Sequence, residues 1–242
     1  MHHPFGLDFK DASLATIFAT CVSCFEYALA GQPAGQAALK LSIARLRLTR
    51  WGEAVGIYHD GNLGEPEADP DDLKAVEAAL VQLIGRFEVL ATTNSNDKSI
   101  LGSVFNQARR SGQPLGPLLK KLDEIACSRG DRQQNPGLLE NTRVLKLGER
   151  TDLLVQDSSE CADTLEEAFP PNGLRQLSRE EMAGITDPRS LHVLRVAASG
   201  IDHWISPRAG NAIRIYGEQN LGLQVGQLVG GISGSMRFTL GD

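Results

Sequence analysis

Aromatic side chains are scarce in this sequence and make up only 5% of its 242 residues. β-Sandwiches and barrels depend on aromatic and β-branched strand residues, whereas Leu and Ala suit packed helices. The hydrophobic content of 41% is that of an ordinary globular protein, and the length allows one large domain or a domain with an appendage. We therefore expect an all-α fold with at most a tiny two-stranded β element.

An excess of basic charge is also missing, because 24 basic residues face 30 acidic ones and the net charge is −6. General nucleic-acid binding needs a basic surface, so no nucleic-acid partner is expected. The cluster Arg45, Arg47 and Arg50 is too short to change this conclusion. We interpret these three arginines as the solvated face of a helix.

Four cysteines are too few for a disulfide scaffold, and the first residues lack the basic and apolar pattern of a secretory signal. A reducing, cytoplasmic location is therefore expected. The longest uncharged window near the start, Ala12 to Phe25, has fourteen residues. A bilayer span needs about 20 apolar residues, so nothing is expected to cross a membrane in the resting state.

No catalytic or metal-binding constellation is recognisable. Cys21 and Cys24 form a C-x-x-C pair, but they lie in an apolar helical segment without a second pair or a nearby His. Buried, unreactive thiols are the favoured interpretation over a redox centre. The five histidines lack ligand spacing, and no nucleophile elbow is present. We expect no catalytic residue, cofactor or metal; the alternative is an enzyme that uses a Cys or a His.

Apolar residues spaced three and four apart predict a series of helices. Asp69 and Pro70 mark a helix start, because Asp is a favoured N-cap and Pro fits the first turn. The expected helices cover residues 14–28, 39–55, 70–90, 100–108, 118–126, 149–168 and 188–205, with a short strand at 144–147. Pro207 is expected to end the last long helix before a further one reaches Tyr216. One core is expected to bury Leu73, Leu80, Phe87, Leu165 and Leu194.

The composition changes near residue 217, where a glycine-rich tail begins. Apolar residues alternate with small or polar ones there, which predicts two short strands and a turn. Two isolated strands are marginal in water, so the tail must dock, remain disordered or pair with another chain. We therefore divide the chain into a helical domain, 1–217, and a tail, 218–242.

Two residues leave alternatives open. Trp51, at a helix end, is expected to anchor the core, with a contact to a partner as the alternative. Glu26 stands between Phe25 and Tyr27 and either faces water or is a buried acid with a functional role.

Four blocks in collinear order carry a resemblance to a known family. They are Cys21–Tyr27 with Gly31–Pro33, Ala44–Leu46 with Leu48–Val55, Leu165–Pro170, and Ser190–Leu191 with Ala197–Asp202. In these blocks, which span nearly all of residues 4–217, the chain resembles the fungal HeLo (prion-inhibition and propagation) family of heterokaryon-incompatibility proteins. The resemblance implies an all-helical domain followed by a prion-forming tail.

The family resemblance implies a function in executing or restraining cell death. An amyloid template would refold the tail, the helical domain would be disrupted, and an amino-terminal segment would enter the plasma membrane. The partners implied are the protein itself and related amyloid-motif proteins. The membrane-segment candidates are Leu14, Ile17, Phe18, Val22 and Phe25. One copy of the amyloid motif is matched by Gln224, Val225, Gly226, Gln227, Leu228 and Val229.

Charges near the start depart from the pattern of the killing members. Asp8, Lys10 and Asp11 lie where those members are apolar. A charge at the bilayer centre costs about 2.5–3.5 kcal/mol on insertion scales, so these residues oppose insertion. They favour the alternative of a non-killing adaptor that has the same fold and no membrane step.

Overall fold

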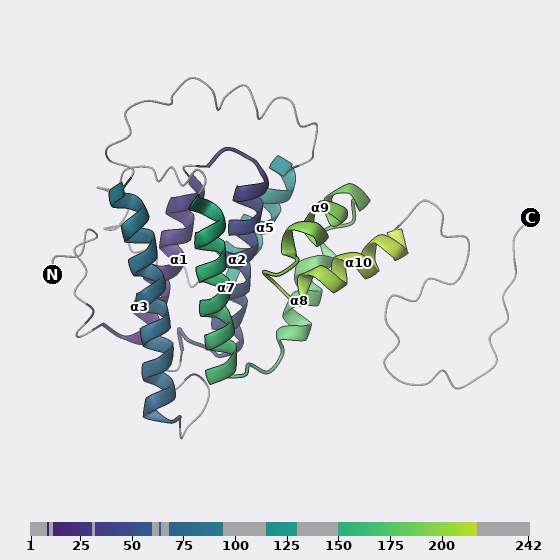
Figure 1. The fold of residues 1–242 in the computed structure, drawn as a ribbon. Helices are drawn as coiled ribbons and strands as arrows, with labels where there is room; N and C mark the ends of the chain where they lie inside the picture. Colours follow the sequence, from purple (N-terminus) through teal and green to yellow (C-terminus); the bar gives the residue numbers. More distant parts are fainter. Residues whose placement is uncertain are drawn as a thin grey trace, which may run out of the picture.

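The computed structural model describes residues 9, 12–30, 32–59, 63, 68–93, 115–129 and 150–216. Within these ranges it contains eight helices and no strand, which confirms the expected all-α fold (Figure 1). The helices are α1 (Leu14–Ala30), α2 (Gln36–Ala54), α3 (Pro70–Thr93), α5 (Leu115–Arg129), α7 (Thr151–Ala168), α8 (Leu174–Ala183), α9 (Pro188–Ala198) and α10 (Ile205–Tyr216). The expected helix at 100–108, the strand at 144–147 and the tail lie outside the described residues.

Helix α2 is the centre of the fold. It packs against α1, α5 and α7, and it also contacts α8 and α9. Fourteen of its nineteen residues are buried, so it is covered on nearly every side. A surface helix shows one apolar stripe, whereas α2 has apolar residues all round, as a central helix requires.

The main core lies between α1, α2, α3 and α7. Phe25 of α1 and Phe87 of α3 meet edge to face with ring centroids 4.9 Å apart. Leu80, Phe87, Leu165 and Leu194 are fully enclosed, as predicted. The prediction for Leu73 is wrong, because this residue of the first turn of α3 is only half-buried at the margin of the core.

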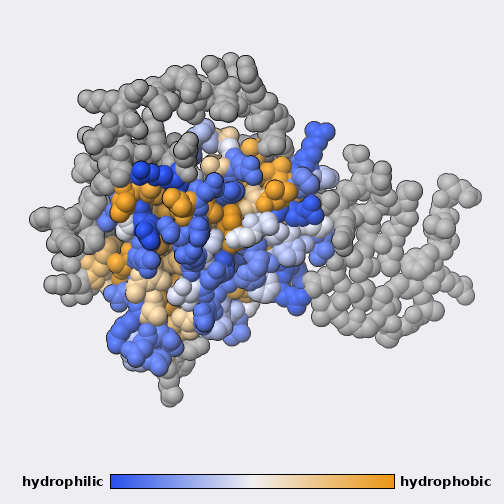
Figure 2. Space-filling view, viewed as in Figure 1, coloured by the Kyte–Doolittle hydropathy of each residue, from blue (hydrophilic) through white to orange (hydrophobic). Residues whose placement is uncertain are grey.

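Helices α8, α9 and α10 form a second group beside the longer helices (Figure 1). Within this group α10 packs against both α9 and α8, and α2 supplies the contacts to α8 and α9. In the view of Figure 2 the surface over α9 and α10 is mainly hydrophilic, whereas hydrophobic residues are visible over the longer helices. We call α8–α10 the carboxyl-terminal group.

The predicted long helix at 188–205 is wrong. α9 ends at Ala198, and Gly200 adopts a φ of +78°, which interrupts a right-handed helix. α10 begins after Asp202, whose carboxylate accepts the N–H groups of Trp204 and Ile205 at 2.9 and 3.1 Å. Pro207 does not end a helix; it lies in the first turn of α10, where a missing N–H costs nothing.

The length and apolar character of each helix decide whether it could cross a bilayer. The described part of the chain has no helix that is both long enough and apolar enough for a bilayer crossing. α1 is apolar but has only 17 residues.

Candidate functional site

Three arginines of α2 are buried, which contradicts the expected solvated face. Arg45, Arg47 and Arg50 are 2%, 3% and 0% exposed. Residues two apart on a helix do not share a face, so Arg45 points to one side of α2 and the other two point away from it. Each guanidinium meets carboxylates from other parts of the fold, which is the condition for burying a charge. We call this set the α2 arginine network.

Arg45 joins α1 and α5 to α2. Its guanidinium pairs with Glu26 of α1 and with Asp123 of α5, the latter at 2.6 Å. It also donates to the Sγ of Cys127 at 3.4 Å. Glu26 is therefore a half-buried acid with a charge partner, and its carboxylate holds α1 against the centre of the fold.

Arg47 joins α7 and the turn before α10 to α2. It donates two parallel hydrogen bonds to Glu166, at 2.9 and 3.0 Å, and one to Asp163 at 2.6 Å. A further N–H reaches the carbonyl oxygen of Ile201 at 3.0 Å. This geometry uses the planar fork of arginine and could not be reproduced by lysine.

Arg50 fastens the carboxyl-terminal group. It pairs with Glu181 of α8 at 2.8 Å and with Asp202 at 2.6 Å, and all three side chains are almost completely enclosed. Arg129 of α5 also pairs with Glu181, and it binds Glu53 at 3.0 Å. Arg50 of α2 and Arg129 of α5 therefore both hold α8, and Arg50 also holds the turn before α10.

Burial and the neighbouring arginines shift the pKa values of Asp202 and Glu181 in opposite directions. Burial alone would raise the pKa of Asp202, but Arg50 and the amides of Ile205 and Trp204 bring it below its ordinary value. For Glu181 burial outweighs the attraction of Arg50 and Arg129, so its pKa is raised. Of these two acids Asp202 holds its charge more strongly, and it serves both as ion-pair partner and as helix cap.

The membrane-segment candidates lie together on α1. Ile17, Phe18, Val22 and Phe25 are buried, and Leu14 is half-buried. Gly52 of α2 allows their close approach, because a Cβ at that position would lie 2.3 Å from Cζ of Phe18. The apolar face of α1 is thus part of the main core.

Trp51 also belongs to this core. It has no exposed surface, and its indole N–H donates to the carbonyl oxygen of Phe169 at 3.2 Å. The side chain is enclosed, so the structure favours the core anchor over the partner contact.

Three of the four cysteines are enclosed in the core. Cys21, Cys24 and Cys161 are buried, and burial raises the pKa of each thiol, that of Cys24 and of Cys161 to about 12. Such thiols are poor nucleophiles at neutral pH. The described ranges contain no group of three or more His, Cys, Asp or Glu side chains able to hold a metal ion. Asp8, Lys10, Asp11 and the motif 224–229 lie outside those ranges.

The sequence matches one protein family over most of its length. The HeLo family, described as prion-inhibition and propagation, matches residues 11–194. The chain is 30% identical to heterokaryon incompatibility protein s of Podospora anserina over 223 residues, which are 88% of this chain and 76% of the relative. It is 29% identical to heterokaryon incompatibility protein S of the same species over the same coverage.

Solved structures agree with this match. The HET-S N-terminal domain superposes with a TM-score of 0.68 at 26% identity, covering 83% of this chain and 93% of that domain. A double-mutant form of the HET-s N-terminal domain superposes with a TM-score of 0.67 at 27% identity, covering 84% and 99%. The fold described above is therefore shared with these domains.

Proposed function

This chain belongs to the HeLo family of prion-inhibition and propagation proteins, and from that premise we propose that it executes or restrains cell death in heterokaryon incompatibility. Its similarity to two heterokaryon incompatibility proteins supports a function of this kind. The proposed mechanism is regulated self-association: the tail is templated into amyloid, the helical domain opens, and α1 is delivered to the plasma membrane from the cytoplasm.

One observation carries the mechanism. The side chains that would enter a bilayer are those that form the core, since Phe18 and Phe25 of α1 are 1% and 0% exposed. α1 cannot occupy the core and the membrane at once, so the folded domain is a restrained state. Release would have to disrupt the packing of α1 on α2 and α3 and the Arg45–Glu26 pair.

The position of the tail suggests how release is triggered. In the sequence the tail follows α10, and the turn that leads into α10 contains Asp202, which is bound to Arg50. Refolding of Gln224–Val229 on an amyloid template would pull on α10 and strain that pair. The proposed partners are therefore a second copy of the chain and related proteins with the same motif, and no cofactor takes part.

Two alternatives remain. A non-killing adaptor with the same fold would self-associate without a membrane step, and the charges of Asp8, Lys10 and Asp11 favour it. A Cys- or His-dependent enzyme has less support, because the raised pKa values of the buried thiols oppose nucleophilic chemistry.

Seeded vesicle leakage distinguishes killing from adaptor function. The full chain is mixed with dye-loaded vesicles and with preformed fibrils of a peptide covering residues 219–242. We expect seeded aggregation together with dye release. Release should increase when Asp8→Asn, Lys10→Gln and Asp11→Asn are combined, because the uncharged stretch then reaches Glu26 and is long enough to cross the hydrocarbon core.

A matched control carries Asp71→Asn, Asp72→Asn and Lys74→Gln, which make the same charge changes in the exposed first turns of α3. Its leakage should equal that of the unmodified chain. Aggregation without dye release, in the unmodified chain and the neutralised variant alike, would rule out killing and establish the adaptor.

The tail is tested separately with the peptide itself. Stacked copies would satisfy every backbone group, and Gln224 and Gln227 could form side-chain ladders, so we expect thioflavin-positive fibres. Val225→Pro should abolish them, because proline removes a backbone donor in the middle of a strand. A peptide that stays soluble for days, even with seeds of family amyloid, would contradict the amyloid step.

A further inference from the structure

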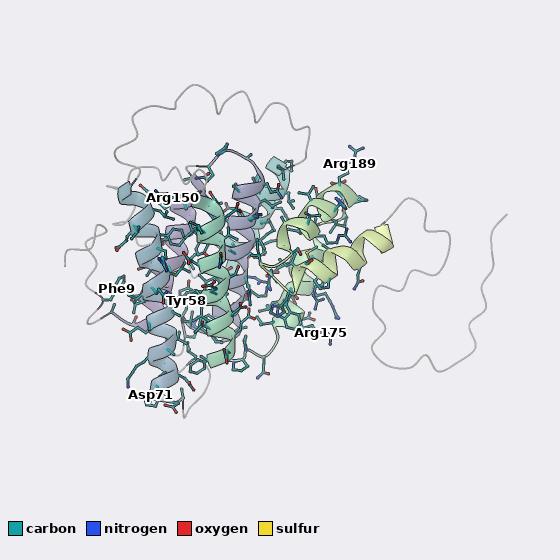
Figure 3. The ribbon with its side chains drawn as sticks, viewed as in Figure 1. Phe9, Tyr58, Asp71, Arg150, Arg175 and Arg189 are labelled. Atoms are coloured by element: carbon teal, nitrogen blue, oxygen red, sulfur yellow. The ribbon has the colours of Figure 1, made fainter. Side chains whose placement is uncertain are left out.

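Three of the six arginines in the carboxyl-terminal group come from the two packed helices α8 and α10 and form no ion pair with a described carboxylate. Arg175 and Arg179 are four residues apart on α8, so they share a face of that helix, and both are exposed. Arg208 is half-buried on α10, which packs against α8. Figure 3 shows Arg175 at the edge of the group where α8 and α10 meet. We call Arg175, Arg179 and Arg208 the α8–α10 arginine patch.

The carboxyl-terminal group cannot neutralise this patch with its own acids. Residues 174–216 contain six arginines and only four acidic residues. Glu181 and Asp202 are buried against Arg50 and Arg129, which come from α2 and α5. Two of the four acidic residues of the group are therefore already paired with arginines from α2 and α5.

The other two acids form no ion pair with the patch either. Asp187 caps α9 by accepting the N–H of Ser190 at 2.8 Å, and Glu180 accepts a hydrogen bond from Gln176 at 2.8 Å. Among the described residues, no carboxylate forms an ion pair with any arginine of the α8–α10 patch. The patch is a local excess of positive charge on a chain whose net charge is −6.

The positive charges of Arg175 and Arg179 act on Arg208 across the contact between α8 and α10. Partial burial lowers the pKa of Arg208, and the neighbouring charges of Arg179, Arg175 and Arg50 lower it further, against the opposing effect of Glu181. Like charges held together without counter-charges repel each other, so an anion bound across them would be stabilising.

The guanidinium groups of the patch indicate which class of partner it would bind. Guanidinium groups bind phosphate oxygens through parallel hydrogen bonds. The cavity found between α3 and α7 is lined by other residues. A nucleic acid would need a longer basic surface than three arginines provide. A membrane presents phosphates in a plane, and the field of a local patch acts within a Debye length of about 10 Å.

We propose that Arg175, Arg179 and Arg208 bind the anionic phosphate headgroups of a lipid membrane. This inference rests on the proposed membrane function and adds a docking step to it. The folded protein would attach through its carboxyl-terminal group before α1 is released. Attachment would place the domain at the bilayer in its restrained state.

Vesicle sedimentation with the unseeded full chain tests the proposal. Vesicles are made of phosphatidylcholine alone or with a third of phosphatidylserine, and bound protein is measured at low and physiological salt. We expect binding to the anionic vesicles only, weakening as salt is raised. Combining Arg175→Gln, Arg179→Gln and Arg208→Gln should weaken binding by roughly tenfold or more, because each arginine near an anionic surface contributes to affinity.

A matched control removes three positive charges elsewhere with Lys74→Gln, Lys120→Gln and Arg189→Gln. All three residues are exposed, and Figure 3 shows Arg189 at the opposite end of the carboxyl-terminal group from Arg175. This control should bind within about twofold of the unmodified chain. Replacing the patch arginines by lysine should keep most of the binding, which separates charge from folding, and melting temperatures are compared for all variants.

Several outcomes would overturn the proposal. These are equal binding to both vesicle types, equal weakening in the patch variant and its control, and self-association of the chain through the patch instead of membrane binding. The result is independent of the proposed killing step. Salt-sensitive binding without seeded leakage would leave the docking patch intact and refute killing, whereas seeded leakage together with unchanged vesicle binding in the patch variant would refute docking alone.

Discussion

At position 50, a guanidinium without exposed surface is enclosed by the carboxylates of Glu181 and Asp202. Taking such charges out of water is costly, and their attraction offsets the cost only while the set is complete. The stability of the carboxyl-terminal group is therefore concentrated in a few side chains.

We expect Arg50→Met to lower the free energy of unfolding by about 3–5 kcal/mol, because it leaves the buried carboxylate of Asp202 without a counter-charge and Glu181 with Arg129 alone. Chemical denaturation measures this change. The comparison is Lys74→Met, which breaks the exposed pair with Asp71 and should change stability by less than about 1 kcal/mol. Equal effects of the two substitutions would contradict the role given to the buried network.

Residue-level features explain both the successes and the errors of prediction from sequence. Asp69 was recognisable as an N-cap because it precedes a proline, and its carboxylate accepts an N–H of the following turn, as that of Asp187 does before Pro188. The acids that bind Arg45, Arg47 and Arg50 come from segments 19 to 152 residues away, and no local pattern links them. The apolar residues on all sides of α2 were the available signal that these arginines could not face water.

At the scale of elements, the contact between α1 and α2 depends on the absence of a side chain. Gly52 faces the ring of Phe18, which is itself held between Trp51 and Tyr58 at centroid distances of 6.0 and 5.6 Å. A methyl group at Gly52 would have to displace this ring from a packed environment.

Gly52→Ala is therefore expected to destabilise the domain by about 1–3 kcal/mol despite the higher helix propensity of alanine. The control is Gly85→Ala in α3, where an added Cβ would meet no atom within 4 Å. That substitution should stabilise the domain by roughly 0.5–1 kcal/mol. Thermal unfolding of both variants gives the comparison, and a stabilising Gly52→Ala would show that α1 is not tightly packed there.

Helix boundaries were harder to predict than helices. The segment 188–205 keeps apolar spacing through Ile201 and Ile205, so the pattern alone does not reveal the break. The interruption depends on the left-handed conformation of Gly200 and on the capping by Asp202. α8 was missed altogether, because its ten residues contain only Leu174, Leu177 and Met182 as large apolar side chains.

At the scale of the whole molecule, two groups of helices are joined chiefly through α2. Contacts from α2 reach α8 and α9, and the buried ion pairs of Arg50 lie at the same junction. Loss of these pairs should loosen the carboxyl-terminal group before the main core, because local opening follows the weakest set of contacts.

Hydrogen exchange tests this expectation. In Asp202→Asn the amides of α8, α9 and α10 should exchange roughly a hundredfold faster, while those of α3 and α7 change little. Asp187→Asn retains a good N-cap on α9 and should leave the exchange pattern almost unaltered. Uniform acceleration over all helices in the Asp202 variant would mean that the molecule opens as a single unit.

The chain has two tryptophans, and one lies in the main core while the other belongs to the carboxyl-terminal group. Trp51 lies against Phe18 in the main core, and the ring of Trp204, just before α10, lies tilted against that of His203 with centroids 5.0 Å apart. Departure of α1 would expose the first ring to water, and detachment of α10 would change the surroundings of the second. Variants that keep a single tryptophan would therefore report the two events as separate changes in fluorescence emission, so that the order and timing of opening could be followed optically in the unlabelled protein.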